Sequence, residues 1–200
     1  MNNEIISLDL ETSGVDIEKG VTILSIGMVH LATGAEFYRE AKHDLLVVEP
    51  RASRVHQLDM NSLDIGEKET LASIDLLARL WLGDVTKVEK QHRLISLGWN
   101  VAGFDMPFVR KFLPKTASQF SYRSIDLNAV LFAEDVVRGR ALLETKRMYK
   151  KLFPNANAHN ALADAKAAAH VFEQYTLTQQ LQPLLSSAQE AAELFEGATI

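Results

Sequence analysis

The stretch Ser7–Gly14, SLDLETSG, places two acids in a segment that otherwise has the apolar pattern of a buried strand. Because side chains alternate along a strand, Asp9 and Glu11 point to one face, and Leu8 and Leu10 point to the other. Two neighbouring carboxylates repel each other unless a cation lies between them, and oxygen ligands suit hard ions such as Mg²⁺ and Mn²⁺. The stretch therefore predicts either a strand with a solvated acidic face or a metal site.

The composition predicts a folded domain. The chain has 200 residues, of which 47% are hydrophobic, so it can bury a sizeable core. Cysteine is absent, which excludes disulfides and thiolate metal sites and fits a reducing cytosol. The N-terminus lacks a signal-peptide pattern, and no window approaches the ~18 apolar residues of a membrane span. We expect a cytoplasmic protein with no membrane contact.

The charge is distributed unevenly. The net charge of −5 argues against a protein that coats nucleic acid by bulk electrostatics. Residues 138–151 nevertheless carry six basic side chains against the single acid Glu144, whereas the only charged residues of 186–200 are acids. A basic face at 138–151 suits a phosphate backbone, and a solvated helix face explains the run equally well.

The apolar periodicity predicts three strands followed by alternating helices and strands. Short turns between the first three strands indicate an antiparallel meander, and the order as a whole implies a mixed sheet with helices on its faces. We expect one main domain over residues 1–178 and a helical extension over 179–200. The expected strands are 4–11, 21–30, 35–39, 93–99 and 122–125, and the expected helices are 67–81, 106–113, 127–137, 161–179 and 181–195.

A second acid follows a strand end in GWNVAGFD, Gly98–Asp105. Asp105 precedes a helix with Pro107 in its first turn, so capping of that helix would explain it. Its place at the end of a strand also suits a ligand site in a mixed sheet. We expect Asn100 to hydrogen-bond the backbone of the bend.

A third candidate lies in HNALADA, His159–Ala165, at the start of an alanine-rich helix. A lone histidine here is typical of a surface or capping residue. Beside an acidic metal site, however, His159 could take a proton from water near neutral pH, because its unperturbed pKa is about 6.5. Asp164, five residues later, would join the acidic site.

In chain order, LDLETSG, GWNVAGFD and HNALADA resemble the three exonuclease motifs of the DEDDh family of 3′–5′ exonucleases. That family includes polymerase proofreading subunits, RNA-trimming exonucleases and oligoribonucleases. The resemblance covers roughly residues 5–175 and implies a ribonuclease H-like α/β fold, with a mixed five-stranded sheet flanked by helices. The sheet would join a three-strand antiparallel meander to two parallel strands. The H-x4-D spacing matches the histidine variant of the family.

The resemblance also implies a catalytic site with two Mg²⁺ or Mn²⁺ ions about 4 Å apart. One ion would generate and aim a hydroxide, and the other would stabilise the departing 3′ oxygen. Asp9 would bridge the ions, and His159 would be the general base. The metal ligands implied are Asp9, Glu11, Asp105 and Asp164.

Three further residues are candidates for substrate contact. Thr12 resembles a family position near the terminal 3′-hydroxyl, although a hydrogen bond in the turn explains it equally well. Phe104 could stack on a terminal base, and Asn100 would lie beside it. Trp99, for which we expect core packing, and Tyr149 are further aromatic candidates.

Three positions outside the ligand set also bear on the resemblance. Trp99 stands where many members have histidine. Gln57 replaces the glycine that often follows the residue matched by His56. Asp126 is expected to cap its helix and support the site from outside the metal ligands.

We therefore expect an enzyme that releases nucleoside monophosphates from the 3′ end of DNA or RNA, with a single-stranded substrate. A polymerase or other replication or repair partner, and the oligomeric state, stay open. One alternative is a non-catalytic nucleic-acid-binding or polymerase-associated module on the same fold. Another is an aspartate-nucleophile phosphatase, which would need a second aspartate at Glu11 and would leave Asp105 and His159 without a role.

Overall fold

The computed structural model describes residues 4–44, 46–49, 68–86, 93–152 and 159–197. His56 and Gln57 lie outside the described residues. The elements in chain order are β1 (Ile5–Thr12), η1 (Ile17–Lys19), β2 (Ile23–His30), β3 (Glu36–Glu40), α1 (Leu71–Val85), β4 (Leu94–Gly98), α2 (Asp105–Phe112), α3 (Pro114–Ala117), β5 (Phe120–Asp126), α4 (Leu127–Val137), α5 (Glu144–Leu152) and α6 (Ala161–Gly197).

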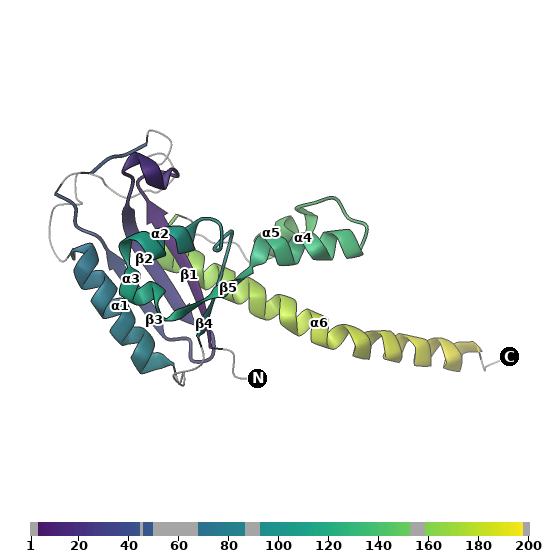
Figure 1. Ribbon diagram of the computed structural model, residues 1–200. Helices are drawn as coiled ribbons and strands as arrows, with labels where there is room; N and C mark the ends of the chain where they lie inside the picture. The colour runs from purple at the N-terminus through teal and green to yellow at the C-terminus, as the bar shows by residue number, and fades with distance from the viewer. Residues whose placement is uncertain (1–3, 45, 50–67, 87–92, 153–158, 198–200) are drawn as a thin grey trace. The chain divides into compact units, whose positions relative to one another are not determined.

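The five strands form one mixed sheet in the order β3-β2-β1-β4-β5 (Figure 1). β1 pairs antiparallel with β2, which pairs antiparallel with β3, while β4 and β5 extend the other side in parallel. This topology confirms the predicted meander joined to two parallel strands. β1, which carries Asp9 and Glu11, lies at the centre of the sheet.

The two faces of β1 meet different helices. Ile6, Leu8 and Leu10 are buried in one hydrophobic cluster with apolar side chains of α1 and α2. The removal of these side chains from water stabilises the sheet by about 25 cal/mol per Å² of apolar area. On the opposite face, the Ser7 hydroxyl donates a hydrogen bond to the Ala165 carbonyl in α6, at 2.7 Å. Asp9 and Glu11 share this second face.

Gly27 lets the start of α6 approach the sheet closely. This residue lies opposite Asp9 in the β1–β2 pairing. A Cβ atom built on Gly27 would lie 2.3 Å from the carbonyl carbon of Ala161 and 2.3 Å from the amide nitrogen of Leu162. Both contacts are with backbone, so no side chain could move aside. The first turn of α6 can therefore lie directly against the sheet because residue 27 has no side chain.

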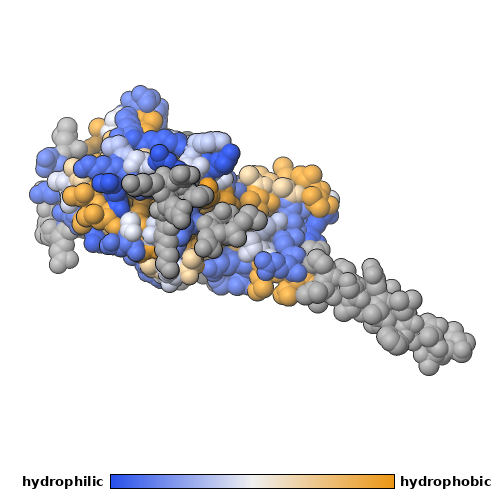
Figure 2. Space-filling model, turned by 60° about the horizontal axis from the view of Figure 1, so that its bottom comes forward, coloured by the Kyte–Doolittle hydropathy of each residue, from blue (hydrophilic) through white to orange (hydrophobic). Residues whose placement is uncertain are grey.

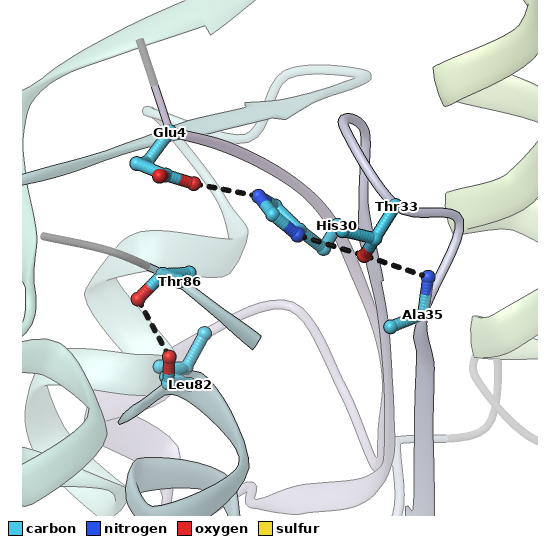
Figure 3. A network of polar contacts seen from close by, with 6 residues as sticks. All are labelled: Glu4, His30, Thr33, Ala35, Leu82 and Thr86. Carbon is cyan, nitrogen blue, oxygen red and sulfur yellow. Dashed lines mark hydrogen bonds and ion pairs between the residues drawn. The ribbon is translucent and has the colours of Figure 1, made fainter. Parts of the chain in front are cut away.

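A buried histidine joins the start of β1 to the β2–β3 turn (Figure 3). His30 Nε2 lies 2.7 Å from Glu4 Oε2, and His30 Nδ1 lies 2.9 Å from Thr33 Oγ1. The Thr33 oxygen also accepts a hydrogen bond from the Ala35 N–H, at 3.3 Å. The polar groups at this end of the meander are thus satisfied without solvent.

Two aspartates organise the α4–α5 pair. Asp126 caps α4 by accepting the Asn128 N–H at 2.9 Å, as predicted. Buried Asp135 accepts hydrogen bonds from the backbone and hydroxyl of Thr145 near the start of α5. α5 occupies much of the basic segment 138–151. Exposed apolar side chains gather on this pair (Figure 2), namely Val136, Val137, Leu142, Leu143 and Met148.

The helix boundaries differ from the expected ones in three places. α1 begins at Leu71, after the capping residue Thr70, and continues to Val85. α6 is one helix, Ala161–Gly197, where we expected two, and it continues past Pro183. The short elements η1 and α3 and the helix α5 are absent from the expected elements.

The chain divides into two compact units, Met1–Ala169 and His170–Ile200. The first contains the sheet and all three motifs, and the second contains the rest of α6. Among the described residues, no helix has both the length and the apolar character needed to cross a bilayer.

We predict that Gly27→Ala destabilises the protein by about 2–3 kcal/mol, because the added methyl group overlaps the backbone of α6. Gly83→Ala is the matched control. Gly83 lies in α1 with no atom within 4 Å of an added Cβ, so alanine there should stabilise by about 0.5–1 kcal/mol. Urea unfolding of both variants checks this. Equal effects in the two variants would contradict the close approach of α6.

Candidate active site

Four carboxylates lie near residues 9–11 of β1. Burial raises the pKa of Asp9 well above its usual range, and the negative charges of Asp105, Asp164 and Glu11 raise it further. Electrostatic effects of this kind require the charges to lie close together. The three motifs, far apart in the sequence, therefore supply acids to one place.

Asp105 reaches this place from the first turn of α2 rather than by capping that helix. The N-cap residue is Phe104, which makes no side-chain capping bond, so the expected capping role is wrong. Instead, Asp105 Oδ1 accepts the Leu10 N–H at 3.0 Å. Burial raises the pKa of Asp105, the Leu10 hydrogen bond lowers it, and the charges of Glu11 and Asp126 raise it. Since Leu10 lies between Asp9 and Glu11, this bond fixes Asp105 against both.

The third motif brings an imidazole and the fourth acid. The ligand atoms of Glu11, His159 and Asp164 all lie within 4.8 Å of one another. His159 adopts a left-handed backbone conformation, with φ of 69°, and its N–H donates to Asp164 Oδ2 at 2.8 Å. Asn160 caps the start of α6 by accepting the Ala163 N–H at 3.1 Å. The turn before α6 thus aims His159 and Asp164 at the same point.

The donor set fits divalent cations. Glu11, His159 and Asp164 bring their ligand atoms together, and Asp9 and Asp105 lie close enough for the acids to repel one another. Oxygen-rich sites of this type select Mg²⁺ or Mn²⁺. Burial and then the charge of Asp164 raise the pKa of Glu11 to about 7. A bound cation would reverse this electrostatic penalty, because it favours the charged carboxylates. Asp9, Glu11, Asp105 and Asp164 are the residues that could hold it.

The predicted substrate residues lie around this cluster with structural contacts of their own. The Thr12 hydroxyl donates to the Gly14 carbonyl at 2.7 Å, as a turn residue would. Asn100, with φ of 59°, holds the bend through its main chain, because its carbonyl accepts the N–H groups of Gly103 and Phe104. The Phe104 ring packs on the Phe108 ring, with centroids 5.2 Å apart.

Trp99 was expected to pack in the core, but it does not. Its ring is only partly buried, and the amines of Lys146 and Lys150 lie 4.6 Å and 5.8 Å from the ring centroid. Sequence reasoning also missed Ser7 and Gly27, which let the start of α6 pack against the sheet. Ser7 shares the strand face of Asp9 and Glu11, and this alternation was the signal that could have found it.

We predict that, in the presence of a chelator, the protein loses stability as the pH rises from about 5 to about 8. The folded-state pKa of Glu11, about 7, lies above its ordinary value of 4.5, so the folded protein holds the proton more tightly. The stabilisation is complete below about pH 4.5 and is lost as the pH rises through about 7. Glu11 alone should account for about 1–2 kcal/mol of this loss.

Thermal unfolding of wild type and Glu11→Gln across this pH range is the measurement. The glutamine variant should show a shallower decline, and Glu18→Gln, which removes an exposed carboxylate, should decline as wild type does. Identical pH dependence in Glu11→Gln and wild type would contradict the clustering of the carboxylates.

Comparison with known proteins supports the interpretation of the motifs. No family model matches the chain. It is 25% identical to an oligoribonuclease of Paracidovorax citrulli (strain AAC00-1) over an alignment of 190 residues, which covers 84% of this chain and 85% of the relative.

Solved structures share the fold. Cell-death related nuclease 4 superposes with a TM-score of 0.61 at 12% identity, covering 88% of this chain. E. coli exonuclease I in complex with a dT13 oligonucleotide has a TM-score of 0.65 at 18% identity, and the match covers 92% of this chain. The nuclease domain of 3′hExo, a DEDDh family member bound to rAMP, has a TM-score of 0.58 at 15% identity, covering 88% of this chain and 92% of that one.

The chain spans 64% of the length of cell-death related nuclease 4 and 42% of that of exonuclease I. The sheet order is the one expected of the ribonuclease H-like fold, and the acids and the histidine of the three ordered motifs converge in one place. These features and likenesses support the resemblance of the chain to the DEDDh family of 3′–5′ exonucleases, whose fold it shares.

Proposed function

We propose that this protein is a metal-dependent exonuclease that releases nucleoside monophosphates from the 3′ end of single-stranded DNA or RNA, with His159 as the general base. The observation that carries the proposal is the meeting of Glu11, His159 and Asp164 within 4.8 Å, beside two further acids coupled to them by charge. We further propose that it acts in the cytoplasm, which its lack of cysteine favours.

The four carboxylates are proposed to hold two divalent ions. When bound, such a pair supplies Lewis-acid activation of a water molecule and stabilises the departing 3′ oxygen. Asp9, whose pKa is raised by the charge of each other acid, would hold the ions together with Glu11, Asp105 and Asp164. Asp105, which the Leu10 N–H holds in place, would give the site rigidity.

The role of His159 follows from its exposure and its fixed backbone. Its imidazole lies at the edge of the acidic cluster and is exposed, so a proton taken from the attacking water can pass to solvent. The hydrogen bond from its backbone N–H to Asp164 fixes the main chain that carries the imidazole beside that acid.

The substrate class is supported by what related proteins bind. The exonuclease I structure contains an oligonucleotide, and the 3′hExo nuclease domain contains rAMP. We propose that Thr12, Phe104 and Asn100 contact the terminal nucleotide here. A polymerase or repair partner has the family resemblance as its only support.

The direct test uses a 5′-labelled single-stranded oligonucleotide, as DNA and as RNA, with Mg²⁺ or with chelator. We expect a ladder that shortens from the 3′ end and nucleoside monophosphate as the product, only with the metal. Phosphate release from a small phosphomonoester, without shortening of the oligonucleotide, would favour the phosphatase alternative. Binding without cleavage would favour the non-catalytic module.

We predict that Asp9→Asn lowers metal-dependent nucleotide release by at least about a thousandfold, because the acid at the centre of the cluster is lost. The fold should survive, since removal of one of four repelling charges relieves strain in the metal-free protein. Release rates and thermal unfolding in chelator are the measurements. Asp84→Asn, at an exposed acid of α1, is the control. Near-wild-type release by Asp9→Asn would refute the assignment.

We also predict that His159→Ala lowers kcat by about a hundredfold or more while Mn²⁺ affinity changes little. Steady-state kinetics and Mn²⁺ titration separate the two effects. His170→Ala, at another exposed histidine, should leave both unchanged. If the loss in His159→Ala were recovered by excess metal, His159 would be a ligand rather than the base.

A further inference from the structure

Two lysine amines lie over one indole ring near the candidate active site. Lys146 and Lys150 are one turn apart on α5, and their Nζ atoms lie 4.6 Å and 5.8 Å from the centroid of the Trp99 ring. Each contact is a favourable cation–π interaction. The two cations must nevertheless repel each other, because they share one partner.

The two lysines make no ion pair among the described residues, although the charge of Asp126 acts on Lys146 and raises its pKa. Lys146 instead donates to the neutral Oδ1 of Asn128 at 2.5 Å. Burial lowers the pKa of Lys146, and the charge of Lys150 lowers it further. A solvated helix face would show neither the burial nor the convergence on a ring.

The ring lies at the same end of the sheet as the catalytic acids. Trp99 directly follows β4, which runs parallel to β1, so both strands end on this side. The next residue, Asn100, donates its N–H to Asp126 Oδ1 at 3.2 Å. The charge of Asp126 in turn raises the pKa of Asp105. The lysine pair is thus linked to Asp126 through Trp99 and Asn100, and Asp126 is near enough to Asp105 for its charge to act on that acid.

We propose that Trp99, Lys146 and Lys150 form a docking site for the backbone of a single-stranded nucleic acid whose 3′ end occupies the catalytic cluster. This inference rests on the proposed function. A phosphate between the two amines would replace their repulsion with two charge-assisted hydrogen bonds. A base could then stack on the indole face, as bases do on aromatic side chains of proteins that bind single strands. The basic segment 138–151 would then bind this single strand, although the net charge of the protein is negative.

The chain offers a matched control for this site. Lys146→Gln/Lys150→Gln removes two positive charges from α5 at the ring, and Arg147→Gln/Lys151→Gln removes two exposed positive charges from the same helix. The affinity of each variant for a 5′-labelled oligonucleotide of about 12 nucleotides is measured in chelator by fluorescence anisotropy. A salt titration of each variant gives the number of phosphate contacts.

We expect about tenfold weaker binding by the Lys146/Lys150 variant and less than about twofold weakening by the control. The slope of log affinity against log salt should shrink by about 1.4 in the former, which corresponds to two lost phosphate contacts on a single strand. The kcat/KM value should fall for the oligonucleotide more than for a dinucleotide. Trp99→Leu should weaken binding, with Trp99→Phe retaining part of it.

Equal weakening by the two double variants would overturn the proposal in favour of bulk electrostatics, and unchanged binding by both would overturn it outright. If thermal unfolding shows that loss of the Asn128 contact harms the fold, Lys150→Gln alone repeats the test from an exposed residue. Absence of nucleotide release by wild type would refute the proposed function separately, because the binding assay needs no turnover. Equal competition by inorganic phosphate and the oligonucleotide would indicate an anion site without strand recognition and contradict the inference.

Discussion

The main constraint on the structure is that it holds several carboxylates close together, where they repel one another. Burial and neighbouring charges raise the pKa of Asp9, Glu11 and Asp105, so each is less stable as an anion than it would be in water. A chain gains nothing in stability from such a cluster in the absence of cations. The arrangement is therefore best explained by the cations that it can hold, and the packing around it is what keeps the acids from moving apart.

Two contacts provide that packing. The Leu10 N–H holds Asp105 against β1, and the bare Cα of Gly27 lets the first turn of α6 reach the sheet beside Asp9. Each involves the backbone of a strand and an element distant in sequence. Preorganised sites of this kind avoid reorganisation during the reaction, which is why small displacements of supporting elements cost activity.

The sequence predicted much of the sheet because alternation in SLDLETSG and the short turns after it are local signals. The convergence of Asp9, Asp105 and Asp164 followed from ordered motifs rather than from periodicity. Gly27 and Ser7 escaped detection because their roles depend on the approach of α6, which no local pattern encodes. The capping role expected of Asp105 was wrong because its carboxylate instead accepts a hydrogen bond from the backbone of β1. Trp99, expected in the core, instead lies under lysines from a helix 45 residues further along the chain, a contact that spacing alone could not indicate.

The central claim is that the four carboxylates form one site for a pair of divalent ions. A crystal structure of the protein soaked in Mn²⁺, with anomalous diffraction recorded, tests it most directly. The account predicts two anomalous peaks about 4 Å apart, both in contact with Asp9 and with the remaining acids around them. Anomalous density elsewhere on the molecule, with none at Asp9, would contradict it.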